Sequence, residues 1–263
     1  MADALVGFSG YVGSSLRKQT CFEKQYRSSN IKEIQGQTFD IVVCAAAPAQ
    51  KWIANREPLA DFKNIEGLIK HLKTITCSTF ILISTVDIFQ NAIGVNEGSP
   101  VIEAGLHPYG LHRRMLEKFV EDYFANHLIA RLPGLVGPGL RKNVIFDFLN
   151  NNNLHVIDSR GVFQFYPMVN LWYDIQIALK AGLKLVHLTA EPISVADVSL
   201  QCFGRVFDNA LVNPPAVYDF QSSHAALFGG QGRYQYNRRE SIQAVRAYAQ
   251  SEPVSIKAEE GTV

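Results

Sequence analysis

Apolar residues along this chain occur in two alternating patterns. Some form short continuous runs, which are typical of parallel strands covered on both faces. Others recur every three or four positions, which is typical of amphipathic helices. The runs predict strands beginning at residue 4 and over residues 22–26, 40–48, 79–85 and 127–132, and the periodic segments predict helices over 12–19, 59–72 and 109–123. Strands that alternate with helices, without internal repeats, predict an α/β fold with a doubly wound parallel sheet.

After Gly139 the predicted elements become shorter and more mixed. The pattern predicts helices over residues 143–149, 171–181, 195–207 and 241–249, and strands over 154–157, 162–166 and 183–188. A loop-rich stretch with several aromatic residues follows Pro214 and Pro215. We therefore expect a small C-terminal α+β lobe over residues 141–250 and a frayed tail over 251–263.

The first predicted strand runs directly into three glycines, Gly7, Gly10 and Gly13. Gly7 permits a tight strand-to-helix turn, Gly10 lets the backbone approach a pyrophosphate, and Gly13 lets helix and strand pack closely. The start of the helix adds unpaired N–H groups and the positive end of the helix dipole. Residues 1–140 are thus predicted to form a Rossmann-type dinucleotide-binding domain, to which segments of about 155–200 partly return. The predicted phosphate-binding residues are Gly7, Phe8, Ser9, Gly10, Tyr11, Val12 and Gly13.

The second predicted strand ends at Arg27, with no Asp or Glu beside it. In a βαβ nucleotide-binding unit, an acidic residue at this point reads a free ribose hydroxyl, whereas an Arg accommodates a 2′-phosphate. The sequence therefore favours NADP over NAD, the alternative being that Arg27 is a solvated loop cation. The predicted contacts to the adenosine half are Arg27, Ser28, Asn30 and Ile31.

Composition and charge exclude several other classes of protein. The formal net charge of +1 offers no electrostatic reason to bind nucleic acid or an acidic membrane surface. The four cysteines form no C-x-x-C pair and the histidines show no metal-ligand spacing, so we expect neither a disulfide framework nor a metal site. The first strand begins too early to leave room for a signal peptide, and no apolar run approaches a membrane span. We expect a cytoplasmic protein.

Hydroxyl groups lie at the predicted carboxyl end of the strand over 79–85, where open α/β sheets bind ligands. Ser84 and Thr85 end this strand, and Tyr109 begins a helix 24 residues after Thr85. A hydroxyl there can hold a substrate oxygen, and a phenol beside a cation can exchange a proton with it. Arg113 lies four residues after Tyr109 and therefore on the same helix face.

Taken together and in this order, these motifs resemble those of the extended short-chain dehydrogenases/reductases, which are NAD(P)-dependent nucleotide-sugar epimerases, dehydratases and reductases. The dTDP-4-dehydrorhamnose reductase-like branch is the most similar. The matching segments are residues 7–13, 43–47, 64–67, 83–89, 109–113, 131–139 and 191–194. The resemblance implies that Tyr109 exchanges a proton with a sugar oxygen while the nicotinamide exchanges hydride with the carbon, and that Thr85 hydrogen-bonds the same oxygen. It also implies a possible homodimer through the helices over 59–72 and 109–123.

The resemblance further assigns residues to the nicotinamide and to the substrate. Small residues at the end of the strand over 40–48 would let a ligand approach the backbone. The predicted nicotinamide-side residues are Ala45, Ala46, Ala47, Tyr109, Arg113, Leu132, Pro133 and Gly134. The predicted substrate residues are Lys51, Trp52, Asp87, Asn143, Gln164 and Tyr166. Among these, Asn143 reads equally as a helix N-cap, Trp52 as a cover for the core, and Asp87 as a turn residue.

Two departures from the family pattern keep alternatives open. Arg113 stands where the family has a Lys, and its planar fork is not equivalent to an ammonium group. Val86 and Asp87 stand where the dehydratases of the family carry Asp-Glu, which weakens a dehydratase assignment. We therefore expect a reductase or an epimerase of a nucleotide-linked sugar, with Ser84, Thr85, Tyr109 and Arg113 as the catalytic group. The alternative is a regulatory or scaffold protein that binds NAD(P) without turnover.

Overall fold

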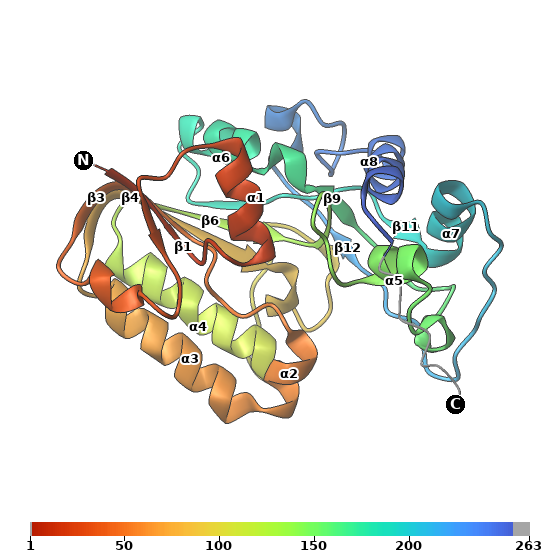
Figure 1. The fold of residues 1–263 in the computed structure, drawn as a ribbon, viewed down its shortest axis with the longest axis horizontal. Coiled ribbons are helices and arrows are strands. Elements are labelled where there is room, and N and C mark those ends of the chain that lie inside the picture. Colours follow the sequence, from red (N-terminus) through yellow and green to blue (C-terminus); the bar gives the residue numbers. More distant parts are fainter. Residues whose placement is uncertain (1, 255–263) are drawn as a thin grey trace, which may run out of the picture.

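The structure is a computed structural model and describes residues 2–254. Its centre is a sheet of six parallel strands (Figure 1). Across the sheet the strands are β10 (Leu185–His187), β6 (His127–Leu132), β4 (Thr76–Thr85), β3 (Thr38–Cys44), β1 (Ala2–Val6) and β2 (Lys24–Tyr26). The chain moves outward from β1 in both directions, so the strand order reverses between β1 and β3. This reversal is where ligands bind in doubly wound sheets.

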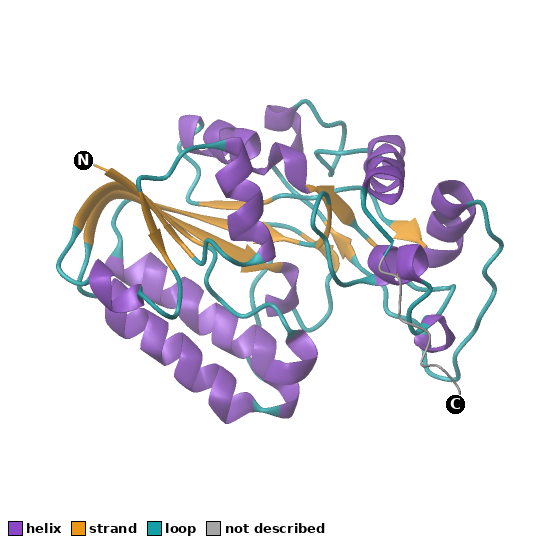
Figure 2. Cartoon of the chain, in the orientation of Figure 1, coloured by secondary structure: helices purple, strands orange, loops and turns teal. Residues whose placement is uncertain are grey.

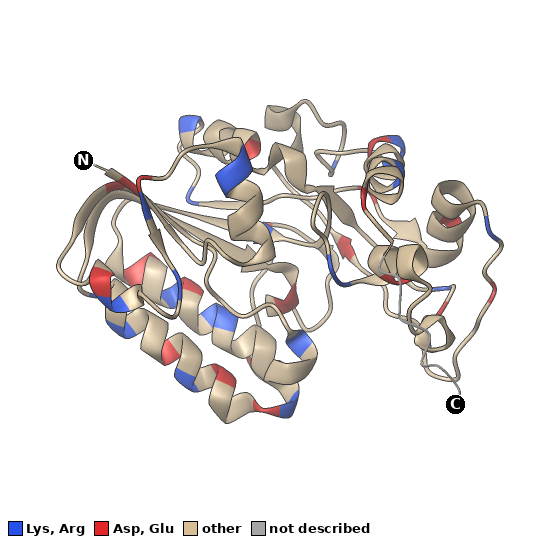
Figure 3. Cartoon of the chain, viewed as in Figure 1, with Lys and Arg blue, Asp and Glu red and all other residues tan. Residues whose placement is uncertain are grey.

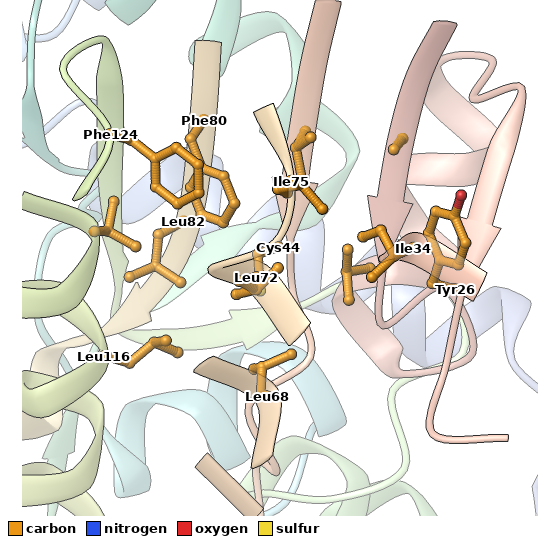
Figure 4. Close-up of a cluster of buried hydrophobic side chains, with 14 of the residues drawn as sticks. Tyr26, Ile34, Cys44, Leu68, Leu72, Ile75, Phe80, Leu82, Leu116 and Phe124 are labelled. Carbon is orange, nitrogen blue, oxygen red and sulfur yellow. The ribbon is translucent and has the colours of Figure 1, made fainter. Parts of the chain in front are cut away.

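Helices cover both faces of this sheet, which explains the continuous apolar runs. On one face lie α3 (Pro58–Leu72) and α4 (Pro108–Tyr123), and on the other lie α1 (Tyr11–Gln19) and α6 (Leu171–Lys180) (Figure 1). All six residues of β6 are buried. Figure 4 shows the core on the α3–α4 side, where the rings of Phe80 and Phe124 stack with their centroids 4.1 Å apart.

The carboxyl ends of the strands point towards a smaller lobe (Figure 2). Its helices are α5 (Val144–Asn150), α7 (Val195–Phe203) and α8 (Arg238–Ser251). Three two-stranded sheets accompany them: β7 (Gly134–Val136) with β9 (Phe165–Pro167), β8 (Val162–Phe163) with β11 (Ile193–Ser194), and β5 (Ile93–Val95) with β12 (Asp219–Phe220). A separate apolar core, which includes Ile145, Phe148 and Val245, joins the three helices.

The predicted α/β class and doubly wound parallel sheet are confirmed, and several details differ. A helix not predicted, α2 (Lys51–Arg56), follows β3. Residues 154–157 do not form the predicted strand, because the chain reaches them through the left-handed residue Asn153 (φ 50°) and turns into a 3-10 helix, Leu154–Val156. The predicted helix over 195–207 ends at Phe203, since Gly204 takes a left-handed conformation at φ 65°.

The C-terminal helix begins three residues before the predicted start. Asn237 and Glu240 form a capping box, in which each side chain accepts a hydrogen bond from the backbone N–H of the other residue. Segments after residue 141 return to the first sheet, because β10 pairs with β6. The domain boundary at residue 140 stays a prediction. Of the tail predicted over 251–263, residues 255–263 lie outside the described residues.

Candidate active site

The glycine turn between β1 and α1 is shaped by close backbone contacts. Gly7 has a φ of 90°, and a Cβ placed on it would lie 2.4 Å from the carbonyl oxygen of Ala45. A Cβ on Gly13 would lie 2.2 Å from the carbonyl oxygen of Gly7. Neither position has room for a side chain, so the turn packs tightly against itself and against the end of β3.

Gly10 is different, because its surroundings are open. It is the N-cap of α1, and no side chain among the described residues caps that helix. A Cβ on Gly10 would have one described atom within 4 Å, the carbonyl oxygen of Gly7 at 3.5 Å. An uncapped helix N-terminus behind an open glycine is suited to an anion such as a diphosphate. Ser9 is exposed beside it, whereas Phe8 and Val12 are half-buried against the sheet.

Two guanidinium groups lie near the far end of this turn. The Cζ atom of Arg17 is 5.3 Å from the centroid of the Phe8 ring, and that of Arg27 is 5.7 Å from it. Arg27 Nε also donates to Ser29 Oγ (2.9 Å), and Asn30 Oδ1 accepts from the backbone N–H of Arg27 (2.7 Å). Arg27 in the loop after β2 and Arg17 on α1 therefore place two cations beside Phe8, and Arg17 was not predicted.

The remaining predicted cofactor residues lie around these groups. Ser28 is exposed in the loop after β2, and Ile31 is half-buried against the core. The other predicted residues follow the carboxyl ends of β3 and β6 and are Ala45, Ala46, Ala47, Pro133 and Gly134, with Leu132 ending β6. A Cβ on Gly134 would lie 2.5 Å from the carbonyl oxygen of Gln164, so this glycine is required by packing against the lobe.

Thr85 and Tyr109 meet at the carboxyl end of β4. Thr85 is the last residue of the strand, and its side chain lies near enough to that of Tyr109, the second residue of α4, to influence the pKa of the phenol. The backbone N–H of Tyr109 donates to Asn55 Oδ1 (3.0 Å), which ties α2 to the start of α4. The pKa of Tyr109 is raised, chiefly because the side chain is buried, while Arg113 and the Thr85 side chain act in the opposite direction.

The Arg113 guanidinium hydrogen-bonds with other groups of the protein. Its Nη1 donates to Asp61 of α3 and its Nη2 to the carbonyl oxygen of Pro48, while its Cζ lies 4.1 Å from the centroid of the Tyr109 ring. The side chain is 3% exposed, and its Nε has no hydrogen-bond partner among the described residues. Arg113 therefore supplies positive charge to the ring face of Tyr109, with both terminal nitrogens already engaged.

Ser84, which was predicted to be catalytic, lies on the opposite side of β4 from Thr85, as neighbouring strand residues do. Its hydroxyl donates to Glu117 Oε1 (2.6 Å), and Glu117 is fully buried in an ion pair with Arg131 (2.8 Å). The Ser84 hydroxyl is thus part of a buried network in the core, and we leave it out of the proposed catalytic group.

Lys51, Asp87 and Tyr218 form a polar cluster beside Tyr109. Asp87 Oδ1 accepts from Lys51 Nζ (2.7 Å) and from Tyr218 Oη (3.2 Å), and Lys51 Nζ lies 3.5 Å from Tyr218 Oη. Burial lowers the pKa of Lys51, whereas Asp87 and Tyr218 raise it, and the net result is a raised pKa. The structure thus brings two of the predicted substrate residues together with a third residue, Tyr218, that comes from the lobe.

The other predicted substrate residues do not face a common site. The Gln164 amide donates to the carbonyls of Ala190 and Phe220 and accepts from the N–H of Phe220, and it is 1% exposed. Tyr166 is fully buried and donates to Asp174 (2.5 Å). Gln164 joins segments of the lobe, whereas Tyr166 packs in the core between the sheet and α6, and the polar atoms of both are used inside the protein.

Asn143 and Trp52 lie at the surface of the lobe and of α2. Asn143 is the N-cap of α5, where its Oδ1 accepts from the N–H of Ile145 (3.0 Å) and its Nδ2 donates to the carbonyl of Leu135 (2.9 Å). The N-cap alternative is therefore the role that the structure shows for Asn143. Trp52 is 63% exposed, with the Cζ of Arg56 5.0 Å from its ring, so it does not cover the core.

Sequence reasoning missed Asp61 and Tyr218, whose partners Arg113 and Asp87 lie 52 and 131 positions away. No local pattern signals such contacts. Arg17 has a local signal, because it lies one and a half turns along the helix that follows the glycines, next to Phe8.

Within residues 2–254 no group of three or more His, Cys, Asp or Glu side chains is arranged to hold a metal ion. In the same part of the chain no helix has both the length and the apolar character needed to cross a bilayer.

No protein-family model and no curated protein matches this chain by sequence. Solved structures do match it over nearly its whole length. A dTDP-4-dehydrorhamnose reductase from Clostridium acetobutylicum is 15% identical, with a TM-score of 0.72 over 95% of this chain and 99% of that one. A UDP-glucose 4-epimerase from Thermotoga maritima, solved with UDP-glucose, is 15% identical, with a TM-score of 0.70 over 95% and 98%. A dTDP-4-dehydrorhamnose reductase from Bacillus anthracis, solved with NADP, is 14% identical, with a TM-score of 0.70 over the same shares.

At these identities the likeness establishes the fold. The resemblance seen in the motifs implied a doubly wound parallel sheet with a small C-terminal lobe, and that architecture is confirmed. The chain has the fold of the dTDP-4-dehydrorhamnose reductases and UDP-sugar epimerases.

Proposed function

We propose that this protein is an NAD(P)-dependent enzyme that acts on a nucleotide-linked sugar by hydride transfer, as a reductase or an epimerase. The observation that carries the proposal is the side-chain pair of Thr85 and Tyr109 at the carboxyl end of β4. This pair stands at the same edge of the sheet as the glycine turn, as a redox site requires. The reductases and the epimerase with the same fold act on substrates of this class.

The glycine turn fits a dinucleotide on physical grounds. Gly7 and Gly13 are needed by packing, whereas Gly10 has open space in front of an uncapped helix, so its lack of a side chain serves a ligand. Bound NADP would supply the nicotinamide that accepts or donates hydride. Arg17 and Arg27 flank Phe8 and supply two positive charges for a 2′-phosphate, so NADP is the preferred cofactor and NAD the alternative.

Tyr109 would hold and move the proton at its Oη. Burial raises its pKa and thereby disfavours the phenolate, while Arg113 at the ring face and the Thr85 hydroxyl favour it. Thr85 would orient the same substrate oxygen. Of the predicted substrate residues, we retain Lys51, Trp52 and Asp87, which lie on α2 and directly after β4, where a sugar would have to pass to reach Tyr109.

Elimination of water from the sugar is not part of the proposal. Dehydratases of the resembled family carry an acidic residue directly after the catalytic Thr. Here that position is Val86, a 4% exposed side chain packed in an apolar cluster with Ile88 and Phe89. A valine has no proton to give.

A second candidate function is supported by Arg113. Because both of its terminal nitrogens are engaged by Asp61 and Pro48, it is not free to hydrogen-bond a nicotinamide ribose as the family Lys does. The protein would then bind NAD(P) as a regulatory or scaffold subunit without turnover.

We also propose that the protein is a homodimer through α3 and α4. These helices lie side by side on the outer face of the sheet (Figure 1), and their exposed apolar side chains include Leu59, Phe62 and Leu111. Figure 3 shows acidic and basic residues interspersed along the same two helices, which suits pairing of this face with a second copy.

The test combines cofactor binding with turnover. NADPH and NADH are titrated by fluorescence, and a panel of UDP-, dTDP- and GDP-sugars and their 4-keto forms is then offered. A reductase consumes NADPH in proportion to product, whereas an epimerase interconverts sugars without net loss. In either case Tyr109→Phe abolishes turnover and leaves NADPH binding intact. Binding without turnover of any sugar selects the scaffold function, and unchanged turnover in Tyr109→Phe removes the catalytic assignment.

A further inference from the structure

The cluster of Lys51, Asp87 and Tyr218 joins three parts of the molecule. Lys51 begins α2, Asp87 lies in the 3-10 turn after β4, and Tyr218 lies directly before β12 in the lobe. The Lys51 side chain is 38% exposed and that of Asp87 18% exposed, so the cluster is accessible from outside. Two of the three N–H donors of the Lys51 ammonium face Asp87 and Tyr218, which leaves the third for a ligand.

The packing of α2 places Lys51 next to the catalytic pair. Asn55 lies one turn after Lys51, so the two side chains share a face of the helix. Asn55 accepts the hydrogen bond from the backbone N–H of Tyr109. Asp87, which pairs with Lys51, is two residues after Thr85, and its N–H donates to Thr85 Oγ1 (3.2 Å). The Lys51 face of α2 is therefore turned towards both Thr85 and Tyr109.

Arg113, in contrast, cannot turn towards an oxygen that approaches Tyr109. Asp61 and the Pro48 carbonyl hold its two terminal nitrogens, and the group is 3% exposed beneath the phenol ring. A cation that is fixed at the ring face stabilises a phenolate, but Arg113 directs its hydrogen-bonded Nη1 and Nη2 atoms at Asp61 and the Pro48 carbonyl.

We propose that the Lys51 ammonium, held in place by Asp87 and Tyr218, stabilises negative charge on Tyr109 and on the reacting substrate oxygen during proton transfer. This inference rests on the proposed function above and assigns to a residue on α2 a task for which Arg113 is not free. Lys51 donates its third N–H to the oxygen, and Asp87 keeps the ammonium charged and in place.

The charged groups around Tyr109 come from every element packed against it. Arg113 lies on α4, Asp87 after β4 and Lys51 on α2, and the ring of His107, just before α4, has its centroid 6.2 Å from that of Tyr109. Arg113 and Lys51 lower the pKa of Tyr109, and Asp87 raises it. Lys51 in turn lowers the pKa of His107, after the larger effect of burial, so His107 adds little positive charge at neutral pH.

The experiment measures the titration of Tyr109 itself. The full chain is labelled with 3,5-difluorotyrosine, because ring fluorination brings phenol titrations into a pH range in which proteins remain folded. The ¹⁹F resonance of Tyr109 among the 10 tyrosines is assigned with Tyr109→Phe. Lys51→Met should raise the titration midpoint of Tyr109 by about one pH unit, and Asp87→Asn should lower it, as expected for charges at this range. Lys51→Arg should restore the midpoint.

Lys180→Met, an exposed lysine at the end of α6, is the matched control and should leave the midpoint unchanged. An unchanged midpoint in Lys51→Met, or in Lys51→Gln if the Met variant does not fold, overturns the proposal. If Lys51 only ties the lobe to α2, these variants lower the thermal midpoint without moving the Tyr109 resonance, which likewise overturns it. Because this titration needs no substrate, it decides the role of Lys51 even if every nucleotide sugar in the activity panel fails.

Where a substrate is found, the pH profile of turnover gives an independent reading. Lys51→Met should shift the midpoint of the limb that reports Tyr109 to higher pH by the same amount, with NADPH affinity unchanged. A loss of NADPH affinity in this variant would place Lys51 at the cofactor and overturn the assignment.

Discussion

Asp61 on α3 and Arg113 on α4 form an ion pair whose two side chains are 4% and 3% exposed. The same carboxylate oxygen, Asp61 Oδ2, also hydrogen-bonds with His112 Nδ1 (2.7 Å). Burial of two charges costs solvation free energy, so the pair is tolerated only while both partners are present. The pair therefore links the stability of the two helices to the position of Tyr109, the proposed catalytic residue.

Removal of one partner should be costly. Asp61→Asn leaves the Arg113 charge buried without its counter-ion, and we expect the free energy of unfolding to fall by about 3–5 kcal/mol. Urea denaturation followed by circular dichroism measures this. Glu66→Gln on the same helix breaks an exposed pair with Lys70 and should cost less than about 1 kcal/mol. Similar small losses in both variants would show that the buried pair contributes no more than a surface one.

Arg113→Lys should not restore a more active enzyme. The planar fork of Arg113 reaches Asp61 and the Pro48 carbonyl at once, whereas one ammonium group cannot span both. With Asp61 present, the shorter Lys is held by that carboxylate, and the start of α4 shifts. We expect turnover to fall by roughly 100-fold, the size of effect that follows from a small misplacement of a reacting group. Steady-state kinetics at saturating NADPH tests this, and equal or faster turnover would contradict it.

The glycine turn gives a matched pair of substitutions. A methyl group on Gly13 would meet the carbonyl of Gly7 at 2.2 Å, so Gly13→Ala should lower the thermal midpoint. A methyl group on Gly10 fits the protein, because its φ is −73° and the nearest atom lies at 3.5 Å. Gly10→Ala should therefore keep its thermal midpoint yet lose at least about tenfold in NADPH affinity, through a clash with the phosphates. Normal NADPH affinity in Gly10→Ala would refute the assignment of this turn.

Arg27 should discriminate between the two cofactors. A guanidinium–phosphate contact is a charged hydrogen bond of about 1.5–3 kcal/mol. Arg27→Ala should thus raise the Kd for NADPH by roughly 10- to 100-fold and leave the Kd for NADH unchanged. Lys18→Ala, an exposed residue next to Arg17 on α1, is the control. Equal effects on both cofactors would mean that Arg27 does not read the 2′-phosphate.

Stability should respond to His187 in acid. This residue is fully buried; its Nδ1 faces the carbonyl of Gln221 (2.9 Å) and its Nε2 faces Arg131 (3.2 Å), so the fold holds it neutral. Burial, reinforced by Arg131, lowers its pKa to about 4 against 6.5 in the unfolded chain. Between these values the unfolded chain binds the extra proton. The contribution of His187 is therefore present above pH 6.5 and is lost as the pH falls towards 4, by at most about 1.4 kcal/mol per pH unit.

The titration of Asp174 changes the stability of the fold in the opposite direction to that of His187, over a similar pH range. Burial raises its pKa to about 6, so its effect makes the fold less stable as the pH rises from 3.8 to 6. Urea midpoints of wild type and His187→Gln, compared between pH 4 and 7, separate the two groups. The variant should lose less stability on acidification than wild type, and identical slopes would contradict the prediction.

The sequence predicts the sheet and the backbone part of the site because both depend on local patterns. The apolar runs give the strands of the sheet, and Gly7, Gly10 and Gly13 give the turn, each from a few consecutive residues. Thr85 and Tyr109 follow from their spacing together with the resemblance to a family. The side chains that these residues contact could not be predicted from the sequence, because the contacts join distant parts of the chain.

The predicted site residues that do not lie beside Tyr109 have one physical cause in common: their side chains contact parts of the chain that are distant in sequence. Gln164 lies between β8 and β9, and Tyr166 lies on β9, but both use their polar atoms on buried groups of the protein: Gln164 on Ala190 and Phe220, and Tyr166 on Asp174 of α6. Ser84 and Thr85 are neighbours in sequence, yet a strand sends them to opposite faces, and only Thr85 reaches Tyr109. Tyr218 was seen only as one aromatic residue among several, because its partner Asp87 lies 131 positions away.

The hydrogen bonds of the Gln164 side chain have a consequence for the stability of the lobe. The strands of the lobe are two or three residues long, too short to hold each other by backbone pairing alone. The Gln164 amide bridges the gap, because it bonds the carbonyl of Ala190 and both the carbonyl and the N–H of Phe220. One side chain thus makes hydrogen bonds that a further strand would otherwise make, and it joins segments of the lobe that are distant in sequence.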